Sequence, residues 1–181
     1  MKSLDRFLQS WRMGKAAKWT RPGDRVLDVG CHQGEFFRKY GREIGISVGI
    51  DPLAVPRADG KFRLINGHFP DGNVFPRESF DTLIMLAVIE HVEDRASIFR
   101  EAAHVLSKAG RVIVTVPSPR VDAILEILVR LKIADGMSLE EHGGFDPESL
   151  PETAGECGFR VLHRESFQFG LNNLMVFEKT S

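Results

Sequence analysis

At 181 residues, the chain is long enough for one α/β domain with a full hydrophobic core and short for two. Its composition, with 43% hydrophobic and 27% charged residues, is that of an ordinary globular protein and excludes a largely disordered chain. The formal net charge of -1 excludes the strongly basic surface that nucleic-acid binding requires, so we expect no nucleic-acid partner.

Cysteine usage and hydropathy indicate the compartment. Cys31 and Cys157 form no C-x-x-C pair, so neither a disulfide framework nor a zinc site is expected. No apolar run reaches the roughly 20 residues that cross a bilayer. Charged residues also interrupt the first ten positions, unlike a signal peptide. We therefore predict a cytoplasmic protein with no stable membrane insertion.

The first predicted element is an amphipathic helix within residues 1–20. Apolar residues recur at helical spacing from Leu4 to Trp11, which predicts a helix from Ser3 to about Trp19. Such a helix either packs on the domain or covers the mouth of a ligand site. The sequence leaves both alternatives open.

A buried strand that turns tightly into a helix is predicted over residues 26–36. It carries an acid, Asp28, and two glycines, Gly30 and Gly34, which let the backbone approach a ligand closely. A dinucleotide fingerprint, G-x-G-x-x-G, fails here because His32 stands at its second glycine. Asp28 would repel a phosphate, so a ligand with an adenosine half and a cationic amino-acid half suits this turn better.

A second acid ends the next predicted strand, which runs from Gly45 to Asp51 and precedes Pro52. In a doubly wound sheet this strand tip lies beside the glycine turn, where a carboxylate can accept hydrogen bonds from both ribose hydroxyls. Asp51 follows Gly30 by about 20 residues, the spacing expected of a ribose acid. An ordinary turn residue before proline is the alternative.

Three further strands continue the sheet. The third, Phe62–Asn66, follows a crossover with little room for a helix and precedes the turn Gly67–Phe69. The fourth, Phe80–Leu86, is apolar enough for the centre of the sheet. A helix from Asp94 to about Leu106 leads to the fifth strand, Gly110–Pro117.

The C-terminal part is predicted to hold two helices and a hairpin. A largely apolar helix runs from Arg120 to Ile133, and a glycine-flanked loop with His142 follows it. A second helix begins at Asp146–Pro147 and reaches Cys157. Residues 159–167 and 172–179 alternate as an antiparallel hairpin.

Two motifs carry a resemblance to a known family. The stretch with Asp28, Gly30 and Gly34 resembles the glycine-rich first motif of class I S-adenosylmethionine (SAM) dependent methyltransferases, with His32 replacing its middle glycine. Residues 87–94, which contain a Glu-His pair after the fourth strand, resemble the fourth motif of the methyltransferases that include the ubiquinone and menaquinone biosynthetic enzymes.

The resemblance implies the architecture. It implies an α/β fold with a doubly wound, mostly parallel seven-stranded sheet and a C-terminal antiparallel hairpin. It further implies a single domain over residues 1–181 with a lid-like insertion at 118–146. We expect a monomer or a homodimer.

The resemblance also implies SAM as cofactor and S-adenosylhomocysteine (SAH) as product. His68 stands where family members often carry an acid that binds the adenine amino group, although a neutral imidazole nitrogen can still accept a hydrogen bond. The residues expected to bind the cofactor lie in the turns after the first, second, third and fourth strands. They are Asp28, Gly30, Cys31, Gly34, Asp51, Pro52, Gly67, His68, Phe69, Leu86 and Ala87.

Methyl transfer from a sulfonium is an in-line displacement, so the protein must chiefly align acceptor, methyl and sulfur. A base is required only where the acceptor loses a proton. His142 is the first candidate for this base, with a surface turn as the alternative. His91 is the second, with a structural tie between strand and helix as the alternative. The expected acceptor is a small or medium-sized aromatic or lipid-like molecule, with oxygen as the favoured atom.

Two other functions stay open. A domain of the same fold that binds SAM or SAH without turnover is favoured by the departures at His32 and His68. A nicotinamide-dependent oxidoreductase ranks third because the dinucleotide fingerprint is broken. No set of carboxylates suggests a metal site.

Overall fold

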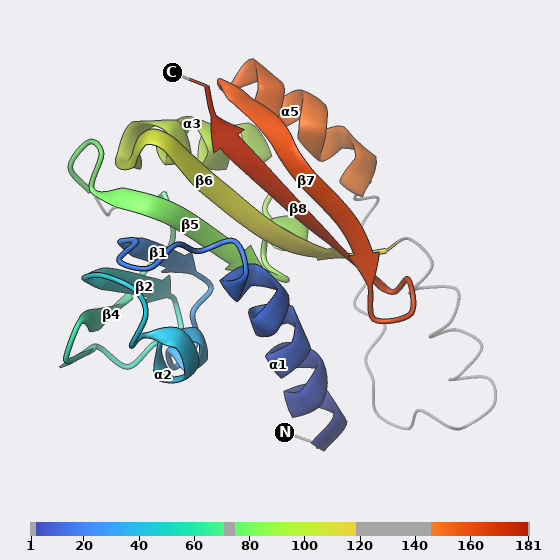
Figure 1. Cartoon of the computed structure of the whole chain (residues 1–181). Helices are drawn as coiled ribbons and strands as arrows, with labels where there is room; N and C mark the ends of the chain where they lie inside the picture. The colour runs from blue at the N-terminus through green and yellow to red at the C-terminus, as the bar shows by residue number, and fades with distance from the viewer. Residues whose placement is uncertain (1–2, 71–74, 119–145, 181) are drawn as a thin grey trace.

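One sheet runs through the chain, which a computed structural model describes over residues 3–70, 75–118 and 146–180 (Figure 1). Its eight strands lie in the order β3-β4-β2-β1-β5-β6-β8-β7. The central five strands, β4, β2, β1, β5 and β6, are parallel, and the strands at both edges are antiparallel to their neighbours. The bounds of the strands are β1 Val26–Val29, β2 Ser47–Asp51, β3 Arg57–Asp59, β4 Phe62–Asn66, β5 Phe80–Leu86, β6 Leu106–Pro117, β7 Phe159–Phe167 and β8 Asn172–Lys179.

Helices cover both faces of the sheet (Figure 1). On one face α1 and α2 bury Met13, Ala16, Phe36 and Phe37 against the sheet, and on the other α3 and α5 bury Phe99 and their other apolar side chains. Each helix therefore contributes one apolar stripe to a core on its own side. The bounds of the helices are α1 Ser3–Ala17, α2 Glu35–Tyr40, α3 Arg95–Val105 and α5 Leu150–Glu156, with short 3-10 turns η1 Ile89–His91 and η2 Pro147–Ser149.

The expected fold class is confirmed, because a mostly parallel sheet carries the antiparallel hairpin β7–β8 at its C-terminal edge. The prediction of seven strands is wrong by one. The additional strand, β3, pairs antiparallel with β4 across the turn at Gly60, and all its residues are exposed. An exposed three-residue strand carries no hydrophobic alternation, which is the signal used to find strands. The predicted helix 120–133 and most of the insertion 118–146 lie outside the described residues.

The N-terminal helix is joined to the C-terminal hairpin. Gln168, in the turn between β7 and β8, is 2% exposed and donates from its Nε2 to the backbone oxygen of Leu8 at 2.8 Å. Asn172 donates to the Oε1 of the same amide at 2.6 Å. Lys15 of α1 and Glu165 of β7 form an ion pair of 2.6 Å. These contacts fix the orientation of α1 over the sheet.

Substitution of Ile98 on α3 tests the core between the sheet and helices α3 and α5, because this side chain is fully buried there. We expect Ile98→Val to lower the free energy of unfolding by about 1 kcal/mol, since one methylene group is lost and a small cavity remains. Ile46→Val is the matched control, because Ile46 is 77% exposed, and it should change stability by less than about 0.5 kcal/mol. Equal effects of both substitutions in urea unfolding would contradict this packing.

None of the helices in the described residues is long and apolar enough to span a membrane.

Candidate cofactor site

The carboxyl ends of β1, β2, β4 and β5 meet along one edge of the sheet. The chain runs from β1 to β2 on one side, while β5 joins β1 on the other, so a topological switch lies between β1 and β5. Ligands of doubly wound folds bind in the crevice outside the strand ends at this point. Two cavities open there, and both are lined by Gly30 and Leu86.

The glycine turn after β1 has the conformation that its sequence requires. Gly30 and Gly34 have φ values of 78° and 80°, where glycine is unstrained. His32 also adopts a positive φ, 46°, which costs conformational energy because its Cβ atom crowds the backbone, and a glycine would avoid this cost. The backbone of the turn therefore keeps a glycine-like shape at the residue that departs from the family motif.

Asp51, at the tip of β2, ties two loops together. Its Oδ2 accepts a hydrogen bond from the backbone N–H of His32 at 2.9 Å, and its Oδ1 accepts one from Leu53 at 2.7 Å. The residue is only 9% exposed and lines the larger of the two cavities. A carboxylate has about four acceptor sites, so each oxygen keeps capacity for a hydroxyl donor.

The larger cavity has a volume of about 430 Å³, within the range of small-molecule sites. Its walls combine apolar side chains with a few polar groups, as such sites do. All the predicted cofactor residues from the second, third and fourth strand ends line it. They are Asp51, Pro52, Gly67, His68, Phe69, Leu86 and Ala87.

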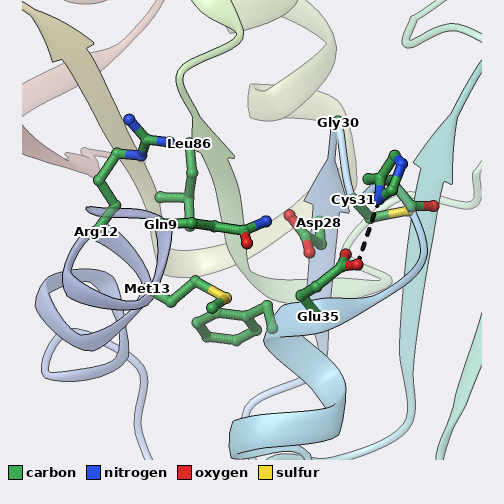
Figure 2. A pocket seen from close by; sticks show the side chains of 10 residues that line it. Gln9, Arg12, Met13, Asp28, Gly30, Cys31, Glu35 and Leu86 are labelled. Carbon is green, nitrogen blue, oxygen red and sulfur yellow. Dashed lines mark hydrogen bonds and ion pairs between the residues drawn. The ribbon is translucent and has the colours of Figure 1, made fainter. Parts of the chain in front are cut away.

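The smaller cavity, about 70 Å³, lies between α1 and the glycine turn (Figure 2). Gln9 and Met13 extend from α1 toward Asp28 and Glu35, and Arg12 of the same helix also lines the cavity. The lining of this cavity therefore includes both carboxyl groups and an arginine. The predicted residue Cys31 also lines it, and burial raises the pKa of this thiol, which keeps it neutral.

Asp28 is the most unusual group at this edge of the sheet. Its side chain comes from β1 and is only 4% exposed. Burial raises the pKa of Asp28 to about 8, and the negative charges of Glu35 and Asp51 add to the rise. At neutral pH the carboxyl is therefore mostly protonated in the free protein.

The contribution of α1 was not predicted residue by residue. Arg12 and Met13 lie three and four positions after Gln9, so all three border the same side of the helix. Burial lowers the pKa of Arg12, and the nearby charge of Glu90 partly offsets this effect. Polar residues on one helical face between apolar ones were the available signal in the sequence.

The three remaining predicted residues differ in where they lie. Gly34 lines neither cavity and instead precedes α2, where its position abuts Leu64. His91, in η1, lines the larger cavity. His142 lies outside the described residues, so its role as a base stays a prediction. Across residues 3–70, 75–118 and 146–180, no three His, Cys, Asp or Glu side chains converge as metal ligands would.

Comparison with known proteins identifies the family. A model of the methyltransferase domain family matches residues 2–164. The ubiquinone biosynthesis O-methyltransferase of Bradyrhizobium sp. (strain ORS 278) is 33% identical over 103 residues, which cover 51% of this chain and 40% of that protein. The 27-O-demethylrifamycin SV methyltransferase of Amycolatopsis mediterranei (strain S699) is 30% identical over 160 residues, covering 74% of this chain and 58% of that protein.

Solved structures share the fold at low sequence identity. A SAM-dependent methyltransferase from Mesorhizobium loti superimposes with a TM-score of 0.68 at 16% identity, covering 92% of this chain and 100% of that one. The 1,6-didemethyltoxoflavin-N1-methyltransferase of Burkholderia thailandensis, with bound 1,6-didemethyltoxoflavin and SAH, gives 0.70 at 16% identity, with coverages of 94% and 79%. The chain therefore belongs to the methyltransferase domain family and has the class I fold of SAM-dependent methyltransferases.

Proposed function

We propose that this chain binds SAM and transfers its methyl group to an oxygen atom of a small or medium-sized aromatic or lipid-like acceptor. The observation that carries the proposal is the pair of adjoining cavities with different chemistry. The narrow one contains Asp28 and Arg12, which complement the ammonium and carboxylate of an amino acid. The wide one contains Asp51 and Phe69, which suit a ribose and a purine.

The residues at the strand ends fit this cofactor. A Cβ atom at Gly30, which lines both cavities, would lie 2.3 Å from Cγ2 of Val88, so any larger residue there would displace a side chain of the wide cavity. Asp28 presents a buried carboxyl to the narrow cavity, and a cationic group is the partner that such a group lacks. Bound SAM supplies an electrophilic methyl group on a positively charged sulfur.

The protein would then act mainly by holding the reactants in line. Asp51 would bind the ribose hydroxyls, and Arg12 and Asp28 would bind the two ends of the amino acid. Alignment of this kind removes much of the entropic barrier to a displacement. Oxygen as acceptor is supported by the names of two relatives, which methylate oxygen in ubiquinone biosynthesis and in a rifamycin.

A proton must leave a hydroxyl acceptor, and His91 is the candidate base among the described residues. It lines the wide cavity beside Val92, at the carboxyl end of β5. A base acts from this edge of the sheet, where substrates of doubly wound folds bind. His142, the first candidate from the sequence, stays a prediction for the same role.

A module that binds SAM or SAH without turnover is the second candidate function. The replacement of an adenine-binding acid by His68, which lines the wide cavity, favours it. Turnover alone separates this alternative from an enzyme, because both bind the cofactor.

Calorimetry with SAM, SAH and NAD tests the proposal first. We expect SAM and SAH to bind with one site per chain and NAD not to bind, because the cavities lack a phosphate-binding turn. Incubation with SAM and a panel of hydroxylated aromatic and lipid acceptors, followed by mass spectrometry, then tests transfer. Absence of SAM binding would contradict the proposal, and binding without transfer to any acceptor would favour the non-catalytic module.

A further inference from the structure

The carboxyl group of Asp28 is buried without the partners that buried acids usually have. It is 4% exposed and faces the narrow cavity (Figure 2). Neither of its oxygens accepts a hydrogen bond from another residue in the part of the chain that the structure describes. Buried polar groups in native proteins are almost always hydrogen-bonded, and exceptions call for a functional reason.

The charges around this carboxyl group discourage its ionisation. Glu35 of α2 lines the same cavity, and the negative charge of Asp51, at the tip of β2, also raises the pKa of Asp28. Arg12 from α1 and His32 from the glycine turn also line the cavity. Two negative neighbours and burial therefore act in the same direction on Asp28, which holds a proton at neutral pH in the free protein.

We propose that binding of the cofactor exchanges this proton for the ammonium group of the ligand, so that Asp28 ionises and one proton leaves for the solvent. The inference rests on the proposed function, since it requires a ligand with an amino-acid end. The balance is complete: the Oδ–H bond of Asp28 breaks, the proton goes to water, and the carboxylate pairs with the ammonium group. No other reactant takes part.

The exchange makes cofactor affinity depend on pH. In the pH range where Asp28 is protonated in the free protein and ionised in the complex, the affinity for the cofactor rises about tenfold for each unit by which the pH increases. The rise ends near pH 8, where Asp28 of the free protein ionises by itself. A ligand with the adenosine half alone leaves the proton in place, so the protein increasingly prefers an intact amino-acid end as the pH rises.

Titration calorimetry of the whole chain with SAH at pH 6.5, in phosphate and in imidazole buffer, measures the proton. The two buffers have different heats of ionisation, so the difference in heat gives the number of protons released. We expect about one proton per SAH, and an affinity about tenfold weaker at pH 6.5 than at pH 7.5. Methylthioadenosine, which lacks the amino-acid end, should release none.

Two variants identify the source of the proton. Asp28→Asn keeps the shape of the side chain without an ionisable group, so SAH should release no proton and bind with no dependence on pH in this range. Glu35→Gln, the matched control on the same cavity, should keep the release of a proton. Its pH dependence should move to lower pH, because a negative neighbour of Asp28 is gone.

The possible outcomes distinguish failure of the proton exchange from failure of the proposed function. SAH binding to the wild type with no difference between buffers would overturn the inference and leave the proposed function intact. Proton release that persists in Asp28→Asn would also overturn it, because another group would be the source. If Asp28→Asn does not fold, the comparison of SAH with methylthioadenosine on the wild type decides alone. Failure of the wild type to bind SAM or SAH would overturn the proposed function and this inference with it.

Discussion

Replacing Asp51 with alanine is expected to weaken SAM binding about 100-fold or more. A hydrogen bond to a charged group contributes about 1.5–3 kcal/mol, and the substitution would remove the two such bonds that we propose between Asp51 and the ribose. The same carboxylate also holds the N–H groups of His32 and Leu53, so the glycine turn loses a support as well. Calorimetry with SAM measures the loss, and thermal unfolding measures the accompanying change in stability.

Two controls separate ribose binding from the support of the loops. Asp51→Asn keeps one acceptor oxygen, so it should hold one loop and lose less stability than the alanine variant while still binding SAM poorly. Asp59→Ala removes an exposed carboxylate from β3 and should leave affinity unchanged. Unchanged affinity in both Asp51 variants would remove the ribose assignment.

Gly30→Ala is expected to reduce SAM affinity about 10- to 100-fold. The new Cβ would lie 2.3 Å from Cγ2 of Val88, a stiff β-branched side chain that must move into the wide cavity it lines. Overpacking of this kind costs about 1–3 kcal/mol, and the ligand would have to reverse it. Calorimetry with SAM measures the effect, and addition of Val88→Ala should restore part of the affinity.

Gly60→Ala is the matched control for backbone strain. Gly60 also has a positive φ, 59°, but a Cβ there meets nothing within 4 Å. Gly60→Ala should lower the free energy of unfolding by about 1 kcal/mol through backbone strain and leave SAM affinity unchanged. Equal affinities in Gly30→Ala and the wild type would show that the cofactor does not need the space between Gly30 and Val88.

Strand positions were predictable where hydrophobic alternation is strong. β4, β5, β7 and β8 have the predicted bounds, because each alternates or runs apolar between clear turn residues. β6 begins at Leu106 instead of Gly110, since Ala109 takes a positive φ beside an irregularity in the pairing with β5. A single residue in the left-handed region lets the strand start early, and the sequence gives little sign of it.

The strand-end part of the site was predictable for a topological reason. In a parallel sheet, residues after successive strands gather at one edge, so Asp28, Asp51 and His68 come together from distant positions. Arg12 was not predictable in this way. Which face of α1 meets the cleft depends on how the helix lies across the sheet, and that depends on contacts with the far end of the chain.

The hydrogen bond from Gln168 to Leu8 has a consequence for the order of assembly. The helix that supplies Arg12 is synthesised well before the turn that orients it, because 160 residues separate Leu8 from Gln168. Until that turn emerges from the ribosome, the nascent chain can form the glycine turn and the central strands while α1 still lacks this hydrogen bond. Competence to bind a ligand through α1 therefore arrives only after the turn between β7 and β8 has been synthesised.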